Sequence, residues 1–324
     1  MSSAIRIHQP GGPEAMVWEE APVAETAAKE VRVRHTAIGV NYIDTYHRSG
    51  LYPLPMPATI GREAAGIIES VGADVTDFAA GDRVTYCTGA LGAYCEVRNV
   101  PADKLIKLPD GITDVQAASM MLKGLTTQYL LRRTYPLKSS DTILFHAAAG
   151  GVGLIASQWA KALGVTMIGT VGSDEKAELA KAHGCTHTIV YTRENFTEKT
   201  RELTGGKGVP VVYDGVGKDT FMGSLDSLSK FGLMVSFGNA SGPVSGVNIG
   251  ILAAKGSLYI TRPTLDTYTQ SREELLAMAG DLFNLVLAGK IKVEPSKTFA
   301  LKDAAEAHRE LESRKTTGSI ILIP

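Results

Sequence analysis

The sequence predicts an α/β protein with two domains, and three observations support this prediction. The chain has 324 residues, which is longer than the usual single domain. Residues 4 to about 100 contain short stretches of strand-forming residues between turn residues, a pattern typical of an antiparallel, barrel-like domain. From residue 142 to about 262, strand and helix patterns alternate, which is typical of a doubly wound parallel sheet.

Composition and charge exclude several classes of protein. Hydrophobic residues make up 44% of the chain and charged residues 21%, which is enough apolar material for two packed cores. The net charge of −1 gives no reason to expect binding to nucleic acid or to an anionic membrane surface. No apolar run approaches the length of a membrane span, and the N-terminus has no signal-peptide pattern. We therefore expect a cytoplasmic protein without a membrane partner.

The three cysteines predict neither a disulfide framework nor a structural zinc site. Cys87, Cys95 and Cys185 are scattered, without the paired spacing that a four-thiolate zinc site requires. None of them is flanked by the histidine and acid that would mark a nucleophile. We expect all three to be buried as small apolar side chains.

In the first domain, the candidate strands are short and separated by turn signals such as Gly72-Ala-Asp74. They cover residues 5–8, 16–18, 31–37, 64–71, 82–86 and 93–97. A helical pattern then begins near Asp114, and a second helix is expected from Leu125 to Arg133.

The parallel sheet is expected to contain six strands, at residues 142–145, 166–171, 187–191, 210–213, 233–237 and 257–261. Two amphipathic helices, at 272–288 and 304–313, and a closing strand at 319–323 follow. If that strand joins the first sheet, the first domain is discontinuous. We then expect it to comprise residues 1–124 and 264–324, with a nucleotide-binding domain at 125–263 inserted.

A glycine-rich turn after the first parallel strand indicates dinucleotide binding. Gly150 and Gly153 occupy the last two glycine positions of G-x-G-x-x-G, and Ala148 stands at the first. The first of these glycines lets backbone approach a pyrophosphate, and the second lets the helix pack closely on the strand. Such a turn can also serve packing alone, but here the next strand returns after a helix of the right length. The complete βαβ unit favours a dinucleotide.

The end of the second parallel strand favours NADPH over NADH. Enzymes specific for NAD usually have an acidic residue there, which holds the ribose 2′-hydroxyl. This chain has Val171, followed by Ser173 and Lys176, which offer a hydrogen-bond donor and a cation to a 2′-phosphate. The alternative is that Ser173 caps the following helix and Lys176 is solvated, and both interpretations can hold together.

Over its whole length the chain resembles the zinc-free NADPH:quinone oxidoreductases. These are relatives of ζ-crystallin in the medium-chain dehydrogenase/reductase superfamily, and the resemblance is to their bacterial members. The matching blocks are Asn41-Tyr-Ile-Asp-Thr-Tyr46, Gly61-Arg-Glu-Ala-Ala-Gly66 and Ser140-Asp-x-x-Leu144 with Ala148-Ala-Gly-Gly-x-Gly153 and Gln158-x-x-Lys161. The resemblance implies a GroES-like β-barrel catalytic domain and a Rossmann nucleotide-binding domain. It also implies a homodimer formed through the last strand of the parallel sheet, around residues 255–261.

Two departures from the zinc alcohol dehydrogenases of the same superfamily restrict the chemistry. Asn41 stands where those enzymes have a cysteine ligand, and Arg62 stands where they have a histidine ligand. An amide and a guanidinium do not replace thiolate and imidazole on zinc. The resemblance therefore implies metal-free hydride transfer from NADPH to a quinone, a conjugated acceptor that delocalises negative charge. The alternatives are an NADPH-dependent 2-alkenal or 2-enone reductase and a non-catalytic nucleotide-binding protein.

The resemblance also implies the site residues. Those implied in catalysis and acceptor binding are Asn41, Tyr46, Tyr52 and Thr126. Those implied in cofactor binding are Asn41, Tyr42, Thr45, Tyr129, Gly150, Gly151, Val152, Gly153, Gly172, Ser173, Lys176, Tyr191, Val216, Phe237, Gly238, Asn239, Ala240, Arg262, Thr264 and Arg314. Ordinary roles compete with some of these assignments. The two acceptor-site tyrosines could pack a loop, Thr126 could cap a helix, and Arg314 could be a helix-end cation. Asp44 and Asp214 are interpreted as capping or turn residues.

Overall fold

The computed structural model describes residues 2–313 and 315–324, and the chain divides into two compact units. Unit 1 comprises Met1–Leu125 and Tyr268–Pro324, and unit 2 comprises Thr126–Thr267. The sequence placed these divisions at 124/125 and 263/264. Residues 264–267 therefore belong with the parallel sheet and not with the returning segment.

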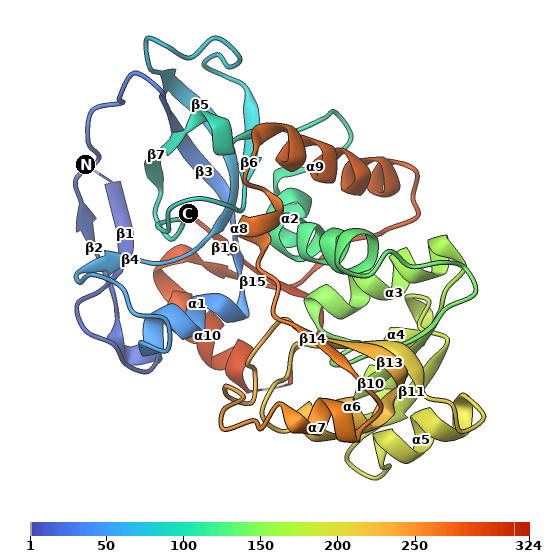
Figure 1. Cartoon of the computed structure of the whole chain (residues 1–324). Coiled ribbons are helices and arrows are strands. Elements are labelled where there is room, and N and C mark those ends of the chain that lie inside the picture. The colour runs from blue at the N-terminus through green and yellow to red at the C-terminus, as the bar shows by residue number, and fades with distance from the viewer. Residues whose placement is uncertain (1, 314) are drawn as a thin grey trace. The chain divides into compact units, whose positions relative to one another are not determined.

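Unit 1 contains two sheets, of three and seven strands, built mainly from antiparallel pairs (Figure 1). The small sheet has the order β2-β1-β4, and the large one the order β15-β16-β3-β5-β6-β8, with β7 also paired to β3. The strands are β1 (Ser2–Ile7), β2 (Met16–Ala21), β3 (Glu30–Val40), β4 (Ala58–Thr59), β5 (Glu63–Val71), β6 (Arg83–Tyr86), β7 (Val97–Pro101), β8 (Ile106–Lys107), β15 (Pro295–Ala300) and β16 (Ser319–Ile323). The C-terminal strand β16 pairs antiparallel with β3, with Leu322 opposite Ile38.

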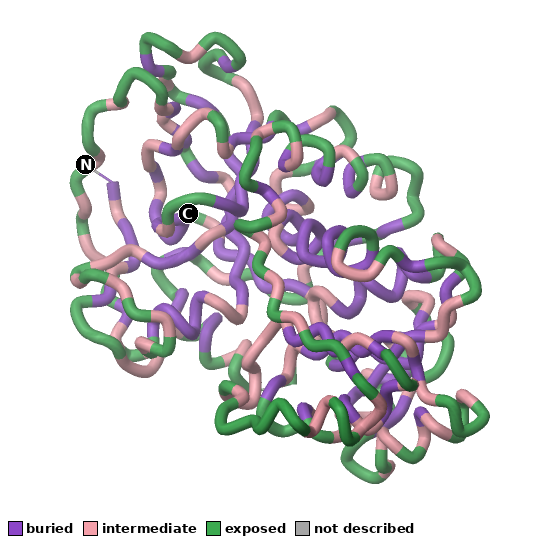
Figure 2. The backbone as a smooth tube through the Cα atoms, in the orientation of Figure 1, coloured by how far each residue is buried: buried purple, intermediate pink, exposed green. Residues whose placement is uncertain are grey.

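The helices of unit 1 lie around these sheets. They are α1 (Tyr42–Ser49), α2 (Asp114–Tyr129, whose last turn enters unit 2), α9 (Arg272–Leu287) and α10 (Ala304–Glu312). The core combines alternate residues of the strands, such as Val31 and Val33 of β3, with Leu301 and Ala304 at the start of α10. Figure 2 shows this buried interior in purple.

Two expectations for unit 1 were wrong, and helix α1 and the strands β4, β8 and β15 were not predicted. The strand expected at 93–97 lies at Val97–Pro101; within residues 93–95 there is only an isolated bridge, Ala4 to Cys95. The helix expected to begin at Leu125 is the continuation of α2, followed by a π-helical stretch, Leu130–Thr134. A Cβ at Gly124 would lie 2.4 Å from Leu282 Cδ2, so this glycine permits the close packing of α2 on α9.

Unit 2 is an α/β domain with one six-stranded parallel sheet of order β11-β10-β9-β12-β13-β14. The strands are β9 (Thr142–Phe145), β10 (Thr166–Val171), β11 (His187–Val190), β12 (Val209–Asp214), β13 (Leu228–Ser236) and β14 (Tyr259–Thr261). The connecting helices are α3 (Gly151–Leu163), α4 (Asp174–Ala182), α5 (Phe196–Leu203), α6 (Phe221–Ser227), α7 (Gly250–Ala254) and, after β14, α8 (Leu265–Tyr268). This order is the doubly wound topology that the sequence predicted.

The strand order reverses between β9 and β12, and this point defines where ligands bind in such sheets. β9, β10 and β12 are buried along almost their whole length, because helices cover the sheet (Figure 2). At one edge, β14 pairs only with β13 and exposes Tyr259 and Ile260, which are 61% and 44% exposed.

Candidate active site

The turn from β9 into α3 forms an uncapped helix N-terminus at the topological switch point. Gly150 is the N-cap of α3 and has no side-chain cap, and the first turn of the helix contains no acidic residue. The first N–H groups of a helix have no intrahelical acceptor and carry a partial positive charge. At Gly153 a Cβ would lie 2.4 Å from the carbonyl oxygen of Ala147, so only glycine permits this close helix-strand packing. Gly151 and Val152 follow the N-cap and are partly accessible.

These residues fit the pyrophosphate of a dinucleotide. Backbone N–H groups with a helix dipole bind anions without a charged side chain, and a carboxylate in the first turn would repel them. The turn consists of alanine and glycine residues, Ala147 to Gly151, so that its surface is mainly backbone. The fit rests on this arrangement of Gly150, Gly151 and Gly153 in unit 2.

The turn after β10 places Ser173 and Lys176 together at the N-terminus of α4. Ser173 is the N-cap, and its Oγ accepts a hydrogen bond of 3.4 Å from the backbone N–H of Lys176. Gly172 lies close to Tyr191. A Cβ at position 172 would be 2.9 Å from the Tyr191 hydroxyl, so glycine leaves room for that side chain. Partial burial lowers the pKa of Lys176. The capping role of Ser173 is thus observed, while Lys176 carries a partly desolvated cation.

Two carboxyl groups lie in the first turn of α4, those of Asp174 and Glu175. A hydrogen bond with Ser173 lowers the pKa of Glu175, and Arg193 pairs with Asp174. The guanidinium of Arg193 donates to both carboxylate oxygens of Asp174, and this hydrogen bonding lowers the pKa of the aspartate. The sequence offers no local signal for Arg193, because 19 residues separate it from its partner. The ion pair is exposed, so it contributes little to stability. It does remove one source of repulsion toward a phosphate.

The loops after β12 and β13 lie side by side and are held by Asp214. One oxygen of this buried carboxylate accepts the N–H groups of Val216 and Gly217, at 2.8 and 3.0 Å. The other accepts the hydroxyls of Thr220 and Ser224. Asp214 is therefore a turn residue, as expected.

The loop after β13 carries four of the implied cofactor-binding residues. Phe237 packs against Phe145 of β9, with ring centroids 5.7 Å apart. A Cβ at Gly238 would lie 2.3 Å from the carbonyl oxygen of Gly215, so the two loops touch through backbone. Asn239 and Ala240 follow in the same loop and are partly exposed.

Arg262 and Thr264 follow β14 and are both exposed. The guanidinium of Arg262 donates to the carbonyl oxygen of Ser236 at the end of β13, at 2.8 Å. The hydroxyl of Thr264 is bonded to that of Thr267. Arg314 lies outside the described residues.

In unit 1, the implied acceptor-site residues gather around α1. Asn41 follows β3 and is the N-cap of α1, and Tyr42, Thr45 and Tyr46 lie on the helix. Tyr46 is 5.3 Å from Tyr52 between ring centroids, in an edge-to-face arrangement, and 6.1 Å from Tyr42. The hydroxyl of Thr45 donates to the carbonyl oxygen of Tyr42. The structure thus brings together the tyrosines that the resemblance implied.

A buried polar network attaches α1 to the rest of unit 1. Asp44 Oδ2 accepts the backbone N–H of Asn41 at 2.8 Å and the hydroxyl of Tyr94 at 3.0 Å. His308 Nδ1 lies 2.9 Å from Arg48 Nη1, which can only donate, so the proton of His308 is on Nε2 and points to Tyr94. Burial, with a contribution from Arg48, lowers the pKa of His308 to about 3, consistent with a neutral ring.

The side-chain amide of Asn41 is hydrogen-bonded to a buried carboxylate, that of Glu63. Its Nδ2 donates to Glu63 Oε2 at 2.8 Å, and Lys123 Nζ lies 3.4 Å from the same oxygen. Leu122 N–H donates to the other oxygen of Glu63 at 2.7 Å. In the sequence, Glu63 is visible only as part of a matching motif. A signal for its role is an acidic residue at the start of a strand whose next five residues are apolar or glycine.

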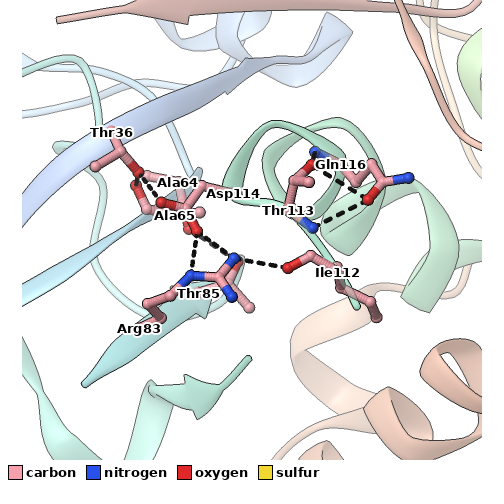
Figure 3. Close-up of polar contacts among 9 residues, drawn as sticks. All are labelled: Thr36, Ala64, Ala65, Arg83, Thr85, Ile112, Thr113, Asp114 and Gln116. Carbon is pink, nitrogen blue, oxygen red and sulfur yellow. Dashed lines mark hydrogen bonds and ion pairs between the residues drawn. The ribbon is translucent and has the colours of Figure 1, made fainter. Parts of the chain in front are cut away.

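Helix α2 brings Lys123 to this cluster, and its N-terminus is fixed to the sheet (Figure 3). Asp114 accepts the hydroxyl of Thr36 at 2.6 Å and two N–H groups of Arg83 at 2.9 and 2.6 Å. Arg83 also donates to the carbonyl oxygen of Ile112. The anionic Asp114 therefore ties the first turn of α2 to β3 and β6, where it also complements the helix dipole.

Thr126 and Tyr129 lie in the last turn of α2 and are 7% and 3% exposed. Thr126 is inside a continuous helix, so the alternative that it caps a helix start is wrong. Both residues belong to unit 2, or to its boundary, and Lys123 belongs to unit 1.

His47 is a further residue that sequence analysis missed. Its ring packs edge-on against Tyr52 at 5.6 Å, and burial, followed by the charge of Arg62, lowers its pKa. Within residues 2–313 and 315–324, no group of three or more His, Cys, Asp or Glu side chains is arranged to hold a metal ion. Over the same residues, no helix combines the length and apolarity that a bilayer crossing requires.

Two family models match the two units. Residues 27–110 match the alcohol dehydrogenase GroES-like domain, and residues 151–278 match the zinc-binding dehydrogenase domain. A GroES-like unit joined to a dinucleotide-binding parallel sheet defines the medium-chain dehydrogenase/reductase class.

Comparison with individual proteins narrows this class. The chain is 58% identical to a quinone oxidoreductase of Pseudomonas aeruginosa over the full length of both. It superimposes with a TM-score of 0.98 on the crystal structure of Escherichia coli quinone oxidoreductase complexed with NADPH, at 54% identity, covering 99% of this chain and 100% of that one. It is 48% identical to a 2-haloacrylate reductase of a Burkholderia species, over 100% of this chain and 99% of that one. The chain belongs to the quinone oxidoreductase family.

Proposed function

We propose that this enzyme reduces quinones with NADPH by hydride transfer, without a metal, and that the residues described above perform this reaction. The observation that carries the proposal is the full-length identity of 58% to a quinone oxidoreductase. The NADPH complex of the E. coli relative supports the choice of cofactor. The uncapped N-terminus of α3 and the Ser173-Lys176 pair supply what that dinucleotide needs.

When bound, NADPH supplies a hydride from C4 of its nicotinamide. The task of this chain is to bind the cofactor and the acceptor, to orient them for hydride transfer, and to exclude water from them. We assign the pyrophosphate to the N–H groups at Gly150, Gly151, Val152 and Gly153, and the 2′-phosphate to Ser173 and Lys176, with Gly172 and Tyr191 beside them. The remaining cofactor contacts are assigned to Tyr42, Thr45, Thr126, Tyr129, Val216, Phe237, Gly238, Asn239, Ala240, Arg262, Thr264 and Arg314.

The acceptor site is assigned to Asn41, Tyr46 and Tyr52. The edge-to-face pair of tyrosines offers an aromatic wall with hydroxyl groups, which suits a flat ring with polar oxygens. The Asn41 amide, oriented by Glu63, is a polar group at the N-terminus of α1. Flat, conjugated acceptors are the class that this combination fits.

We also propose a homodimer formed by pairing of β14 with its copy. An exposed strand edge with apolar side chains, here Tyr259 and Ile260, is a template for pairing. A cytoplasmic location is proposed as well. The three cysteines are buried thiols and none of them forms a disulfide, as suits a reducing compartment.

The test is steady-state oxidation of NADPH, followed by its absorbance, with 1,4-benzoquinone and with a 2-alkenal, and with NADH in place of NADPH as the control. We expect rapid turnover of the quinone with NADPH and much slower turnover with NADH. Absence of turnover with any acceptor, despite NADPH binding, would refute the proposal in favour of a non-catalytic nucleotide-binding protein.

A second candidate is the reduction of a carbon-carbon double bond conjugated to a carbonyl. The 48% identity to a 2-haloacrylate reductase favours it, because that name describes a conjugated, electron-poor acceptor. The fold, cofactor and hydride step would be unchanged. Turnover of 2-chloroacrylate or a 2-alkenal, with none of the quinone, would select this function.

A further inference from the structure

A buried ion pair lies directly behind Asn41 in unit 1. The side chains of Glu63 and Lys123 are 0% and 8% exposed, and they lie 3.4 Å apart. Because Asn41 Nδ2 binds the same carboxylate oxygen at 2.8 Å, Nδ2 and Lys123 Nζ are within about 6 Å of each other. The pair thus adjoins the residue assigned to the acceptor site.

The surrounding chain is shaped to hold this carboxylate. A Cβ at Gly39 would lie 2.4 Å from Glu63 Oε2 and 2.3 Å from the carbonyl oxygen of Ala118, so β3 needs glycine to leave room. Glu63 Oε1 is occupied by the N–H of Leu122, which fixes the carboxylate relative to α2. The ammonium of Lys123 is therefore held at a defined place.

Stability does not account for such a pair. Desolvating two charges costs several kcal/mol each, and apolar residues of similar size are often as stable or more stable. One role of Lys123 is to neutralise the charge of Glu63. The position of Lys123 next to Asn41 points to a second role.

Hydride addition to a quinone or an enone leaves negative charge on the acceptor's oxygen. The two electrons of the hydride reduce the acceptor, and a proton from water then completes the product. A fixed cation in a water-poor site stabilises such an oxygen more strongly than water does.

We propose that the Lys123 ammonium, held by Glu63, stabilises the oxyanion that forms on the acceptor. Lys123 is then a catalytic residue and Glu63 a positioning residue. This inference rests on the proposed function, since it requires hydride transfer to a carbonyl-type acceptor.

The test compares Lys123→Met with Lys123→Arg on a series of quinones from electron-poor to methyl- and methoxy-substituted. In Lys123→Met, we expect kcat to fall by about a hundredfold with the least reactive quinone, the size of effect seen when one oxyanion donor is lost. The loss should shrink for electron-poor quinones, which need less stabilisation. KM for NADPH should stay within about twofold, and Lys123→Arg should recover most of kcat.

Lys123→Met leaves the Glu63 carboxylate buried without its partner, which alone could unfold the protein. The double variant Glu63→Gln with Lys123→Met removes both charges and keeps the volume. Thermal denaturation should show that this double variant is folded. Its loss of kcat should depend on the acceptor in the same way as that of Lys123→Met. A loss of kcat that is equal for all quinones, or no loss of kcat, would overturn the role of Lys123. The proposed function would still stand in that case, provided that the wild type turns over quinones. Absence of wild-type turnover would instead refute the proposed function itself.

Discussion

Ser173 has one observed role, capping α4, and one proposed role, binding the 2′-phosphate. It caps α4 by accepting the N–H of Lys176, and its hydrogen bond with the Glu175 carboxyl shows that the hydroxyl can donate at the same time. Lys176 is partly buried, so its charge is less screened than that of a solvated lysine. Under the proposed assignment, we expect these two neighbouring side chains to discriminate NADPH from NADH.

The variant Ser173→Ala with Lys176→Ala should raise KM for NADPH by about ten- to a hundredfold and leave KM for NADH almost unchanged. A hydrogen bond to a charged group contributes about 1.5–3 kcal/mol, and 1.4 kcal/mol corresponds to a factor of ten. Initial rates at varied cofactor concentration measure both constants. Lys181→Ala, on the same helix but paired with Glu178, is the control. Equal increases for the two cofactors would show that these side chains do not contact the 2′-phosphate.

At the scale of elements, α1 depends on a buried carboxylate at its N-terminus. Asp44 is fully buried, and Oδ1 has no hydrogen-bond partner among the described residues. Burial raises the pKa of Asp44 to about 7, although the N–H of Asn41, the hydroxyl of Tyr94 and the charge of Lys123 lower it. The same helix carries Tyr42 and Tyr46, so the state of this carboxyl bears on the proposed site.

Asp44→Asn should become progressively more stable than the wild type as pH rises from about 4 to about 7. In this window the folded wild type retains a proton that the unfolded chain, with an ordinary aspartate pKa of about 4, has lost. The wild type therefore loses stability as pH rises, by at most about 1.4 kcal/mol per pH unit, and the variant does not. Urea unfolding at several pH values gives the difference. A difference that is constant with pH would mean that the carboxylate is already ionised in the folded protein.

At the scale of the whole molecule, the exposed edge of the parallel sheet is the surface most suited to a second copy. β14 has one paired neighbour, and Tyr259 and Ile260 are large exposed apolar residues on it. Natural sheets usually protect such an edge with charge or cover it. Dimerisation would cover it here.

Ile260→Lys should shift the protein from dimer to monomer at micromolar concentration. A lysine on the edge would face its own copy across a two-fold axis, where like charges repel. Sedimentation velocity distinguishes the 34.4 kDa chain from its dimer. Leu203→Lys, at an exposed apolar residue of α5, is the matched control and should remain dimeric. A monomeric wild type, or a variant that stays dimeric, would rule out this interface.

Local patterns in the sequence determined most of the nucleotide-binding unit. The strand Thr142–Phe145 and the glycine turn that follows are specified by residues adjacent in sequence, as are the polar residues after β10. Strand and helix periodicity are local properties, so the doubly wound sheet and its ligand-binding edge could be predicted from them. The domain fold and the cofactor followed from this pattern and from the family resemblance.

Only the tertiary structure decided the rest, because the deciding contacts join residues far apart in sequence. Gly124 resembles a helix end locally, yet α2 continues past it because Leu282 packs against that glycine. Asn41, Glu63 and Lys123 belong to three separate elements and form one cluster. A pattern of neighbouring residues carries no information about such contacts. Packing between elements brings these three polar residues into one buried, hydrogen-bonded cluster.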